Sequence, residues 1–288
     1  MKPYLKTNRG ILFQGDCLEL LSEMNECSID TVFADPPFNI GKDYKNGYDD
    51  KTSENEYLAW CEKWISECSR VLKPGGSFFL YATPELNIKF GNFLNEHLDF
   101  RHWIAMTMKG TFKRGNRLYP AHYSMLYYTK GEPKTFNDLR TPIPTCRHCK
   151  GEIPDYGGHR NKMNPAGINL MDFWTDTSPN RHKKYKVRDG VNELKAIIPQ
   201  RAIQISTNEN DLVFDPFGGG GSTYQMAQKL NRNWIGVELY DCHHISKRLE
   251  EECGLFKGDE PLFNYHDIIT NVEDSFQPNP LSELSQAL

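Results

Sequence analysis

Short apolar runs alternate along the chain with longer stretches in which apolar residues recur every three or four positions. The short runs predict β-strands and the longer stretches predict helices. Their alternation favours an α/β fold in which a mostly parallel sheet is covered by helices on both faces. We predict seven strands, at residues 10–14, 31–34, 77–81, 103–108, 123–128, 211–214 and 234–237.

Two helices and one irregular region stand out between these strands. Bulky apolar residues recur at helical spacing from Ser53 to Leu72, and the Lys-Pro-Gly-Gly run that follows is expected to stop this helix. A second helix is predicted from Asn192 to Ser206. Between 131 and 192 the periodicity fades in a polar, basic stretch punctuated by prolines, which we interpret as an inserted module. After Gly254 the chain is loosely patterned and either docks on the domain or stays mobile.

A first candidate loop follows the apolar strand at 31–34 and reads Asp35-Pro36-Pro37-Phe38. Ligands of open α/β sheets bind at the carboxyl ends of the strands, where this loop is expected. The two prolines fix the backbone and have no N–H, so we expect their carbonyls to face outward as unshared acceptors. Asp35 and the Pro36 carbonyl would accept both hydrogens of an exocyclic amine, while Phe38 stacks on the base. Taken alone, the tetrapeptide is equally compatible with a simple strand-ending turn.

A second candidate loop follows the strand at 211–214, begins at Asp215 and contains four consecutive glycines. Strand, glycine loop and helix form a nucleotide-binding unit, but Thr223 stands where the dinucleotide fingerprint has its third glycine, so a pyrophosphate is not the expected ligand. Ser222 or Thr223 is expected to cap the helix that follows. Glu238 ends the next strand, 23 residues after Asp215, which suits a carboxylate that binds ribose hydroxyls.

The two loops together resemble those of the β-class amino DNA methyltransferases, in which a D-P-P-[YF] catalytic loop precedes an F-x-G-x-G cofactor loop. The resemblance runs from about residue 12 to 249 and covers the inserted region poorly. It implies a Rossmann-like, seven-stranded methyltransferase sheet that is circularly permuted and carries an inserted target-recognition module. The implied division is a catalytic half at 1–130, the target-recognition region at 131–192, a cofactor-binding half at 193–253 and a tail at 254–288.

The resemblance also implies roles for individual residues, with S-adenosylmethionine as the cofactor. Asp16 and Cys17 are implied to bind the cofactor, and the Asp16 carboxylate would meet its adenine, although by sequence alone Asp16 is equally a helix N-cap. Glu238 would hold the ribose. The residues implied to surround the methionine part are Asp215, Phe217, Gly219, Gly221, Ser222 and Thr223. Asp35, Pro36, Pro37 and Phe38 would form the catalytic loop, with the target base flipped out of the duplex.

The choice of target base rests on the same loop. No proline in this chain is followed by cysteine, so the nucleophile expected for methylation of a ring carbon is absent. Asp35 resembles the adenine-N6 enzymes, because cytosine-N4 enzymes usually carry serine at that position. Adenine N6 is therefore the favoured target and cytosine N4 the alternative. An RNA base methyltransferase and a DNA-binding protein without turnover are the remaining readings.

Composition and charge bear on partners and location. The formal net charge is −4, but residues 101–162 hold 12 Lys and Arg against 4 Asp and Glu, and residues 181–201 hold 7 against 2. These segments are either solvated faces or contacts to double-stranded DNA. The candidate contacts are Arg114, Arg117, Arg140, Arg147, Arg160, Lys162, Lys183 and Lys184. No secretory signal or membrane-length apolar run is present, so a cytoplasmic protein is expected. A restriction endonuclease partner and a homodimer are both compatible with this sequence.

One pattern in the inserted region suggests a metal. Cys146 and Cys149, followed by His159, have the spacing of zinc ligands. A fourth ligand would come from His148, Asp155 or His182. The alternative to a small zinc knuckle is a pair of free thiols beside a phosphate-contacting loop.

Overall fold

The protein is described from a computed structural model. The structure describes residues 1–41, 52–108, 115–116, 118–143, 145, 151–153, 155, 157–177, 194–254 and 260–272. None of the helices within these ranges is long and apolar enough to cross a membrane.

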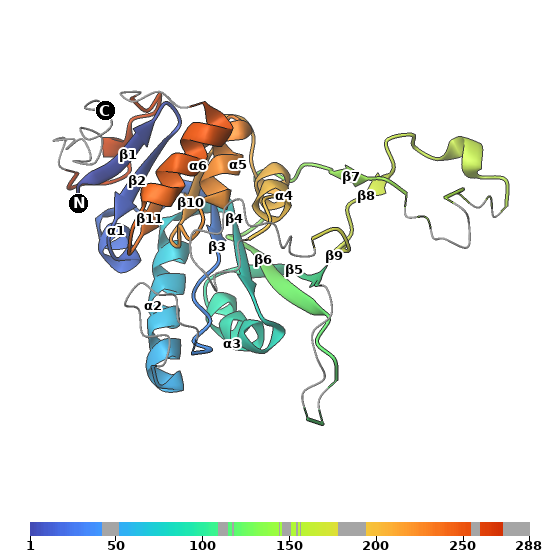
Figure 1. The fold of residues 1–288 in the computed structure, drawn as a ribbon, viewed down its shortest axis with the longest axis horizontal. Coiled ribbons are helices and arrows are strands. Elements are labelled where there is room, and N and C mark those ends of the chain that lie inside the picture. The colour runs from blue at the N-terminus through green and yellow to red at the C-terminus, as the bar shows by residue number, and fades with distance from the viewer. Residues whose placement is uncertain are drawn as a thin grey trace, which may run out of the picture.

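A mixed sheet of nine strands forms the centre of the described structure (Figure 1). In sheet order the strands are β1 (Pro3–Thr7), β2 (Gly10–Gln14), β11 (Asn233–Glu238), β10 (Leu212–Asp215), β3 (Ile29–Ala34), β4 (Leu72–Ala82), β6 (His122–Thr129), β5 (Asp99–Thr107) and β9 (Phe173–Trp174). The strands from β2 to β4 in this order are mutually parallel. β1 is antiparallel to β2, and β6 is antiparallel to β4 and β5. The α/β class is confirmed.

Each of the seven predicted strands is present in this sheet, but the predicted count of seven is wrong for it because β1 and β9 were missed. β1 is an edge strand in which only Pro3 and Thr7 are buried, so it carries no apolar run. β9 is two residues long, which is too short for a periodic signal. Both lie at the ends of the sheet order, so the arrangement of the seven central strands is unaffected.

Within the described ranges, three helices cover each face of the sheet. α1 (Cys17–Glu23), α2 (Glu54–Val71) and α3 (Pro84–Asn95) pack on one face, and α4 (Ile197–Ser206), α5 (Ser222–Lys229) and α6 (His243–Cys253) pack on the other. Successive strand side chains point to opposite faces. Val32 and Phe78 accordingly join the first core, whereas Phe33 and Phe79 join the second. Burial on both faces explains why these strands read as continuous apolar runs.

The predicted helix at 53–72 is confirmed as α2, and its start is explained by its cap. The Ser53 hydroxyl accepts from the Glu56 N–H at 3.3 Å, and the Glu56 carboxylate accepts from the Ser53 N–H at 3.2 Å. This reciprocal capping box satisfies two N–H groups that have no partner within the helix. α2 ends at Val71 and β4 begins at Leu72, so the run at 73–76 lies in the first half of this strand.

The predicted helix at 192–206 begins later than expected. α4 starts at Ile197, and residues 191–193 lie outside the described residues. Pro199 occupies the third helical position. A proline has no N–H and fits only the first turn of a helix, so a helix that contains Pro199 cannot begin as early as Asn192.

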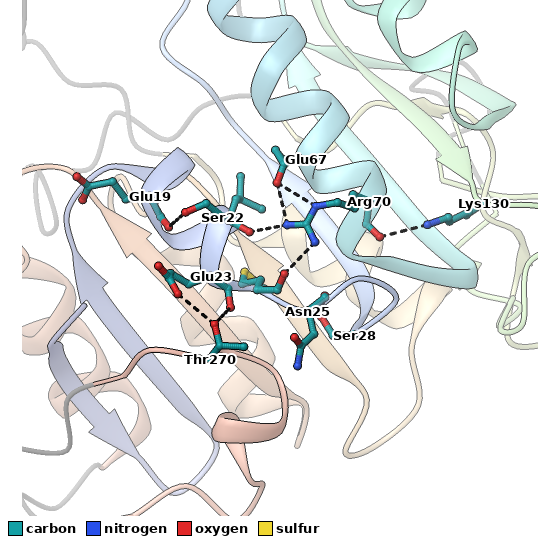
Figure 2. Close-up of polar contacts among 11 residues, drawn as sticks. Glu19, Ser22, Glu23, Asn25, Ser28, Glu67, Arg70, Lys130 and Thr270 are labelled. Carbon is teal, nitrogen blue, oxygen red and sulfur yellow. Dashed lines mark hydrogen bonds and ion pairs between the residues drawn. The ribbon is translucent and has the colours of Figure 1, made fainter.

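Residues 260–272 pack against the N-terminal part of the domain, so the described part of the tail docks. Tyr265, in the 3-10 helix η4 (Tyr265–Asp267), is buried and belongs to the core that contains α1. The Thr270 hydroxyl bonds to the backbone and carboxylate oxygens of Glu23 at the end of α1 (Figure 2).

Arg70 joins the ends of α1 and α2. Its guanidinium donates to the carbonyls of Leu21 and Met24 and pairs with Glu67 at 2.8 Å (Figure 2). The carbonyls of the last helical turn have no partner within their own helix, and a cation there also opposes the negative end of the helix dipole. Lys130 binds the end of α2 in the same way, because its ammonium group donates to the carbonyls of Ser69, Arg70 and Leu72.

An arm projects from the body of the domain (Figure 1). It contains the two-stranded sheet of β7 (Arg140–Thr141) and β8 (Ile168–Asn169) and the 3-10 helix η2 (Arg160–Lys162). The chain then returns through β9, which pairs with β5 of the main sheet. The boundaries of the four predicted regions remain a prediction.

Candidate active site

Four carboxylates lie at the carboxyl ends of four adjacent parallel strands. In sheet order, Asp16 follows β2, Glu238 ends β11, Asp215 ends β10 and Asp35 follows β3. The connections from β10 and β3 lead to opposite sides, because β10 is followed by β11 and β3 by β4. Such a reversal opens a crevice at the carboxyl edge, where open α/β sheets bind their ligands. The sheet therefore brings the two predicted loops together.

The first loop is held from behind by α2. The Tyr57 hydroxyl donates to the Pro37 carbonyl at 2.6 Å. The expectation that both proline carbonyls face outward unshared is therefore wrong for Pro37. Among the described residues, no hydrogen bond reaches the Pro36 carbonyl, and Asp35 beside it is partly exposed. The loop thus combines a partly exposed carboxyl group, Asp35, with a buried proline, Pro36, at the edge of the sheet.

Three aromatic rings surround this loop. Phe38 lies 6.3 Å from Tyr81 and 6.5 Å from Tyr123 between ring centroids, and the two tyrosine rings are 5.4 Å apart. Burial raises the pKa of both tyrosine hydroxyls, and the charge of Asp35 raises each pKa further. Sequence reasoning missed both tyrosines. The available signal was that Tyr81 and Tyr123 lie where β4 ends and β6 begins, at the same edge of an antiparallel pair.

The second loop begins at a buried carboxyl group. Asp215 is 3% exposed, and burial raises its pKa well above the usual range, with further contributions from the charges of Asp35 and Glu238. The Phe217 N–H and the Thr223 side chain hydrogen-bond to it and act in the opposite direction. A cationic ligand would favour the ionised form of this group. The carboxyl groups of Asp215 and Glu238 therefore fit a positively charged ligand such as S-adenosylmethionine.

Gly219 and Gly220 leave part of the loop backbone accessible, whereas Gly218 and Gly221 are buried. Gly219 is exposed, and a Cβ built there meets only the Phe217 carbonyl, at 3.7 Å. Glu238 braces this loop by accepting from the Gly219 N–H at 2.8 Å and the Tyr240 N–H at 3.2 Å. A flat or extended ligand therefore meets bare backbone beside a partly exposed carboxylate. The predicted contact of Glu238 with a ribose remains a prediction.

Asp16 lies one strand further along. It caps α1 by accepting from the Leu18 N–H at 2.7 Å, which confirms the N-cap reading and leaves the predicted contact with adenine untested. The Gly15 N–H donates to the Glu238 carbonyl, so the end of β2 lies against the end of β11. Cys17 is buried, and burial raises the pKa of its thiol.

The predicted cap of α5 is wrong. The N-cap is Gly221, whose φ of +76° is a conformation that glycine adopts readily. Ser222 is the first helical residue, and its hydroxyl donates to the Leu194 carbonyl and accepts from Arg248 at 2.7 Å. Thr223 hydrogen-bonds to Asp215 instead. Both side chains thus tie the loop to its surroundings rather than to the helix N-terminus.

The predicted DNA contacts and metal ligands are only partly described. Arg140, Arg160, Lys162 and His159 are exposed on the arm. The residues Arg114, Arg117, Arg147, Lys183, Lys184, Cys146 and Cys149 lie outside the described residues. Where side chains are described, no group of three His, Cys, Asp or Glu is placed to hold a metal ion. Zinc remains a prediction.

The fold and the site together define an open α/β domain that binds its ligands at the carboxyl edge of the sheet. The model of a DNA methylase family, N6_N4_Mtase, matches residues 29–247. The chain therefore belongs to the N6/N4 DNA methylase family, as its two loops predicted.

Relatives and solved structures agree with this assignment. The chain is 51% identical over 253 residues to the type II methyltransferase M.BamHI of Bacillus amyloliquefaciens, an alignment covering 88% of this chain and 60% of that protein. It is 30% identical to M1.MboII of Moraxella bovis over 79% of this chain and 91% of that protein.

Two solved structures share the fold. The PvuII DNA methyltransferase (cytosine-N4-specific) has a TM-score of 0.61 at 21% identity, with 85% of this chain and 86% of that chain covered. TTHA0409 of Thermus thermophilus, solved in complex with S-adenosylmethionine, has a TM-score of 0.57 at 18% identity, with 92% and 100% covered.

Proposed function

We propose that this chain transfers a methyl group from S-adenosylmethionine to the exocyclic amine of a base in double-stranded DNA. The observation that carries the proposal is the row of four carboxylates at one edge of the sheet. It sets the Asp35 loop directly beside the glycine loop. Membership of the N6/N4 DNA methylase family supports the same conclusion.

On the cofactor side, the proposed contacts follow the order of the strands. Asp16 would meet the adenine, Glu238 the ribose hydroxyls, and the loop that begins at Asp215 the methionine part. When bound, S-adenosylmethionine supplies its methyl group as an electrophile on a positively charged sulfur. The Glu238 carboxylate would favour such a cation, the bound cation would in turn favour the ionised form of Asp215, and the exposed backbone of Gly219 would let the ligand approach closely.

On the substrate side, the Asp35 carboxylate and the Pro36 carbonyl would accept the two hydrogens of the amine. These bonds hold the amine so that its nitrogen lone pair points toward the glycine loop. The partly exposed rings of Phe38 and Tyr123 would offer faces for stacking, and the buried Tyr81 ring packs against both. A base inside a duplex cannot reach this crevice, so the proposal includes extrusion of the target nucleotide.

Two bases carry such an amine. Asp35 favours adenine N6, because it resembles the residue that the adenine enzymes of the family carry at this position. The solved PvuII enzyme is cytosine-N4-specific and shares the fold. The proposal therefore covers both amines, and the identity of the methylated nucleoside distinguishes them.

The direct experiment incubates the purified protein with S-adenosylmethionine and unmethylated duplex DNA of varied sequence, and identifies the methylated nucleoside by mass spectrometry. N6-methyladenine or N4-methylcytosine is expected. Asp35→Ala should abolish transfer and leave cofactor affinity nearly unchanged, because Asp35 is proposed to bind the amine and not the cofactor. Undiminished transfer by this variant contradicts the mechanism. Absence of transfer by the wild-type protein on DNA favours an RNA substrate or a binder without turnover.

The arm is the proposed site of sequence recognition. Arg140 lines a hollow of about 420 Å³ beside the paired strands β7 and β8, together with Asn164 and Asn169. Arginine and asparagine are the side chains that most often read guanine and adenine edges. The names of the relatives, type II methyltransferases, suggest that the chain protects DNA within a restriction-modification system. An endonuclease partner and a homodimer remain predictions.

A further inference from the structure

Each of the two loops receives a hydrogen bond from a buried tyrosine on the helix behind it. Tyr57 of α2 donates to the Pro37 carbonyl at 2.6 Å. Tyr224 of α5 donates to the Asp215 carbonyl at 3.0 Å and lies 3.3 Å from the Val237 carbonyl. Tyr57 is 3% exposed and Tyr224 is fully buried. Neither hydroxyl is accessible to a substrate, so each acts through the protein groups packed around it, which are the loop carbonyls and, for Tyr57, also the Cys61 side chain.

The Asp35 loop needs support from outside because of its own composition. Pro36 and Pro37 have no N–H groups, so they cannot donate the bonds that hold an ordinary turn together. The Tyr57 hydroxyl binds the carbonyl of the peptide group that joins Pro37 to Phe38. It therefore fixes the backbone immediately before the Phe38 side chain. Asn39 follows with a φ of +52°, and its side chain donates to the Thr52 carbonyl at 3.0 Å. The loop is thus held at two points, one on each side of Phe38.

Tyr57 is itself fixed in place. Its ring lies 6.0 Å from Trp60 and 6.5 Å from Phe90 between centroids, in the core beneath the sheet edge. The same helix continues to Trp64, which contacts Phe217 of the glycine loop edge-on at 5.0 Å. α2 therefore touches both loops, but only the Asp35 loop receives a hydrogen bond from Tyr57.

Tyr224 is fixed even more tightly. Its ring stacks on Trp234 at 4.9 Å with an interplanar angle of 19°. Gly236 leaves the space that the ring occupies, because a Cβ there would lie 2.2 Å from it. The hydroxyl ends between the last residues of β10 and β11, so it sets the spacing of the two strands from which Asp215 and Glu238 arise.

We propose that Tyr57 and Tyr224 are positioning residues for separate halves of the reaction. Tyr57 positions the loop that accepts the target amine, and Tyr224 positions the loop that binds the cofactor. This inference rests on the proposed function for its kinetic consequences, whereas its structural consequences are independent of any activity. Loss of the Tyr57 hydroxyl and loss of the Tyr224 hydroxyl should therefore affect different measured quantities, although each substitution removes one buried hydrogen-bond donor.

The test compares Tyr57→Phe and Tyr224→Phe with Tyr128→Phe as a matched control. Tyr128 is also buried and donates to Asn95 at 2.9 Å, between β6 and α3, outside both loops. Each variant removes one oxygen atom and keeps the ring. For each protein we would measure the Kd for S-adenosylmethionine, kcat at saturating cofactor and DNA, backbone hydrogen exchange of both loops, and the free energy of unfolding.

Tyr57→Phe should lower kcat about ten-fold and change the cofactor Kd less than about two-fold. Loss of one hydrogen bond of this kind corresponds to roughly a two- to ten-fold effect, and misplacement of the reacting groups adds to the loss of kcat. Exchange should quicken at residues 38–41 only. Tyr224→Phe should raise the cofactor Kd about ten-fold, quicken exchange at residues 217–221, and leave kcat at saturation nearly unchanged. Tyr128→Phe should lower stability without either effect.

Equal losses of kcat and cofactor affinity in both loop variants would overturn the assignment, as would loop variants that behave like the control. The exchange pattern separates this inference from the proposed function. If the wild-type protein transfers no methyl group, the proposed function fails, while the loop-specific exchange still supports or refutes the positioning roles.

Discussion

The ion pair between Asp176 and Arg201 connects the end of the arm to α4, and its removal gives a prediction with a definite magnitude. Arg201 donates to both carboxylate oxygens, at 2.7 and 2.6 Å, and its guanidinium lies 5.1 Å from the centre of the Trp174 ring. The Arg201 side chain is 9% exposed and that of Asp176 is 57% exposed. The pair thus joins a buried cation to a half-exposed anion.

The expected cost of Asp176→Ala follows from this asymmetry. Exposed ion pairs contribute about 0 to 1 kcal/mol, and breaking a fully buried pair costs about 3 to 5 kcal/mol. A bidentate, charged hydrogen bond with one exposed partner lies between them, so we expect the free energy of unfolding to fall by about 2 kcal/mol. The matched control is Glu251→Ala, which removes an exposed partner of Lys247 at 3.9 Å and should cost less than about 0.5 kcal/mol.

Urea unfolding at several pH values is the assay. The hydrogen bonds from Arg201 lower the pKa of Asp176. A carboxyl group with a lowered folded-state pKa contributes stability above its unfolded pKa of about 3.9, and this contribution is lost as the pH falls through the folded value. The difference between wild type and Asp176→Ala should therefore be full at pH 7 and shrink below about pH 4. A cost no larger than that of Glu251→Ala, or one independent of pH, refutes this reasoning.

Four further predictions follow from the site and the arm. Asp215→Asn should weaken cofactor binding yet stabilise the free protein at neutral pH in urea unfolding. Burial raises the pKa of Asp215, so above about pH 4 this carboxyl group ionises in the unfolded chain before it does in the folded protein, and the resulting loss of stability does not occur with the amide. Glu238→Ala should raise the Kd for S-adenosylmethionine about ten-fold or more in calorimetry, since it removes a charged acceptor beside the glycine loop. Arg140→Ala should relax sequence preference at one position of the DNA site. Lys162→Ala should instead weaken binding to all sequences and reduce the slope of log affinity against log salt concentration by about one, with both variants measured by fluorescence anisotropy. Stoichiometric zinc in metal analysis of the purified protein would support the knuckle, and its absence would eliminate it.

The fold was predictable where local sequence signals agree with tertiary packing. The start of α2 follows from Ser53 and Glu56, which form a capping box, and the central strands follow from apolar runs that are buried on both faces. β1 and β9 gave no such signal, because one is a half-exposed edge and the other has two residues. The start of α4 was misplaced because the restriction that Pro199 imposes was not applied.

The site was predictable as two loops but not as a three-dimensional arrangement. Asp35 and Asp215 were found from their loops, and the strand order now places them on adjacent strands. Tyr57 and Tyr81 were missed, because their contacts with the Asp35 loop depend on how α2 and β4 pack and not on any spacing along the chain. The cap at Ser222 was misjudged for a similar reason, since its hydroxyl is drawn into contacts with α6 and the segment before α4.

The strand order has a consequence for how the chain is made. Among the described strands, β10 and β11 come last along the chain, yet they lie between β2 and β3, which come near its start. Until about residue 238 has left the ribosome, β2 and β3 each lack one of their two neighbours in the sheet, so one edge of each strand is uncovered. Long-range pairing of this kind folds slowly and leaves strand edges open to aggregation. We expect nascent chains of this protein to depend on chaperones until the last two strands close the sheet.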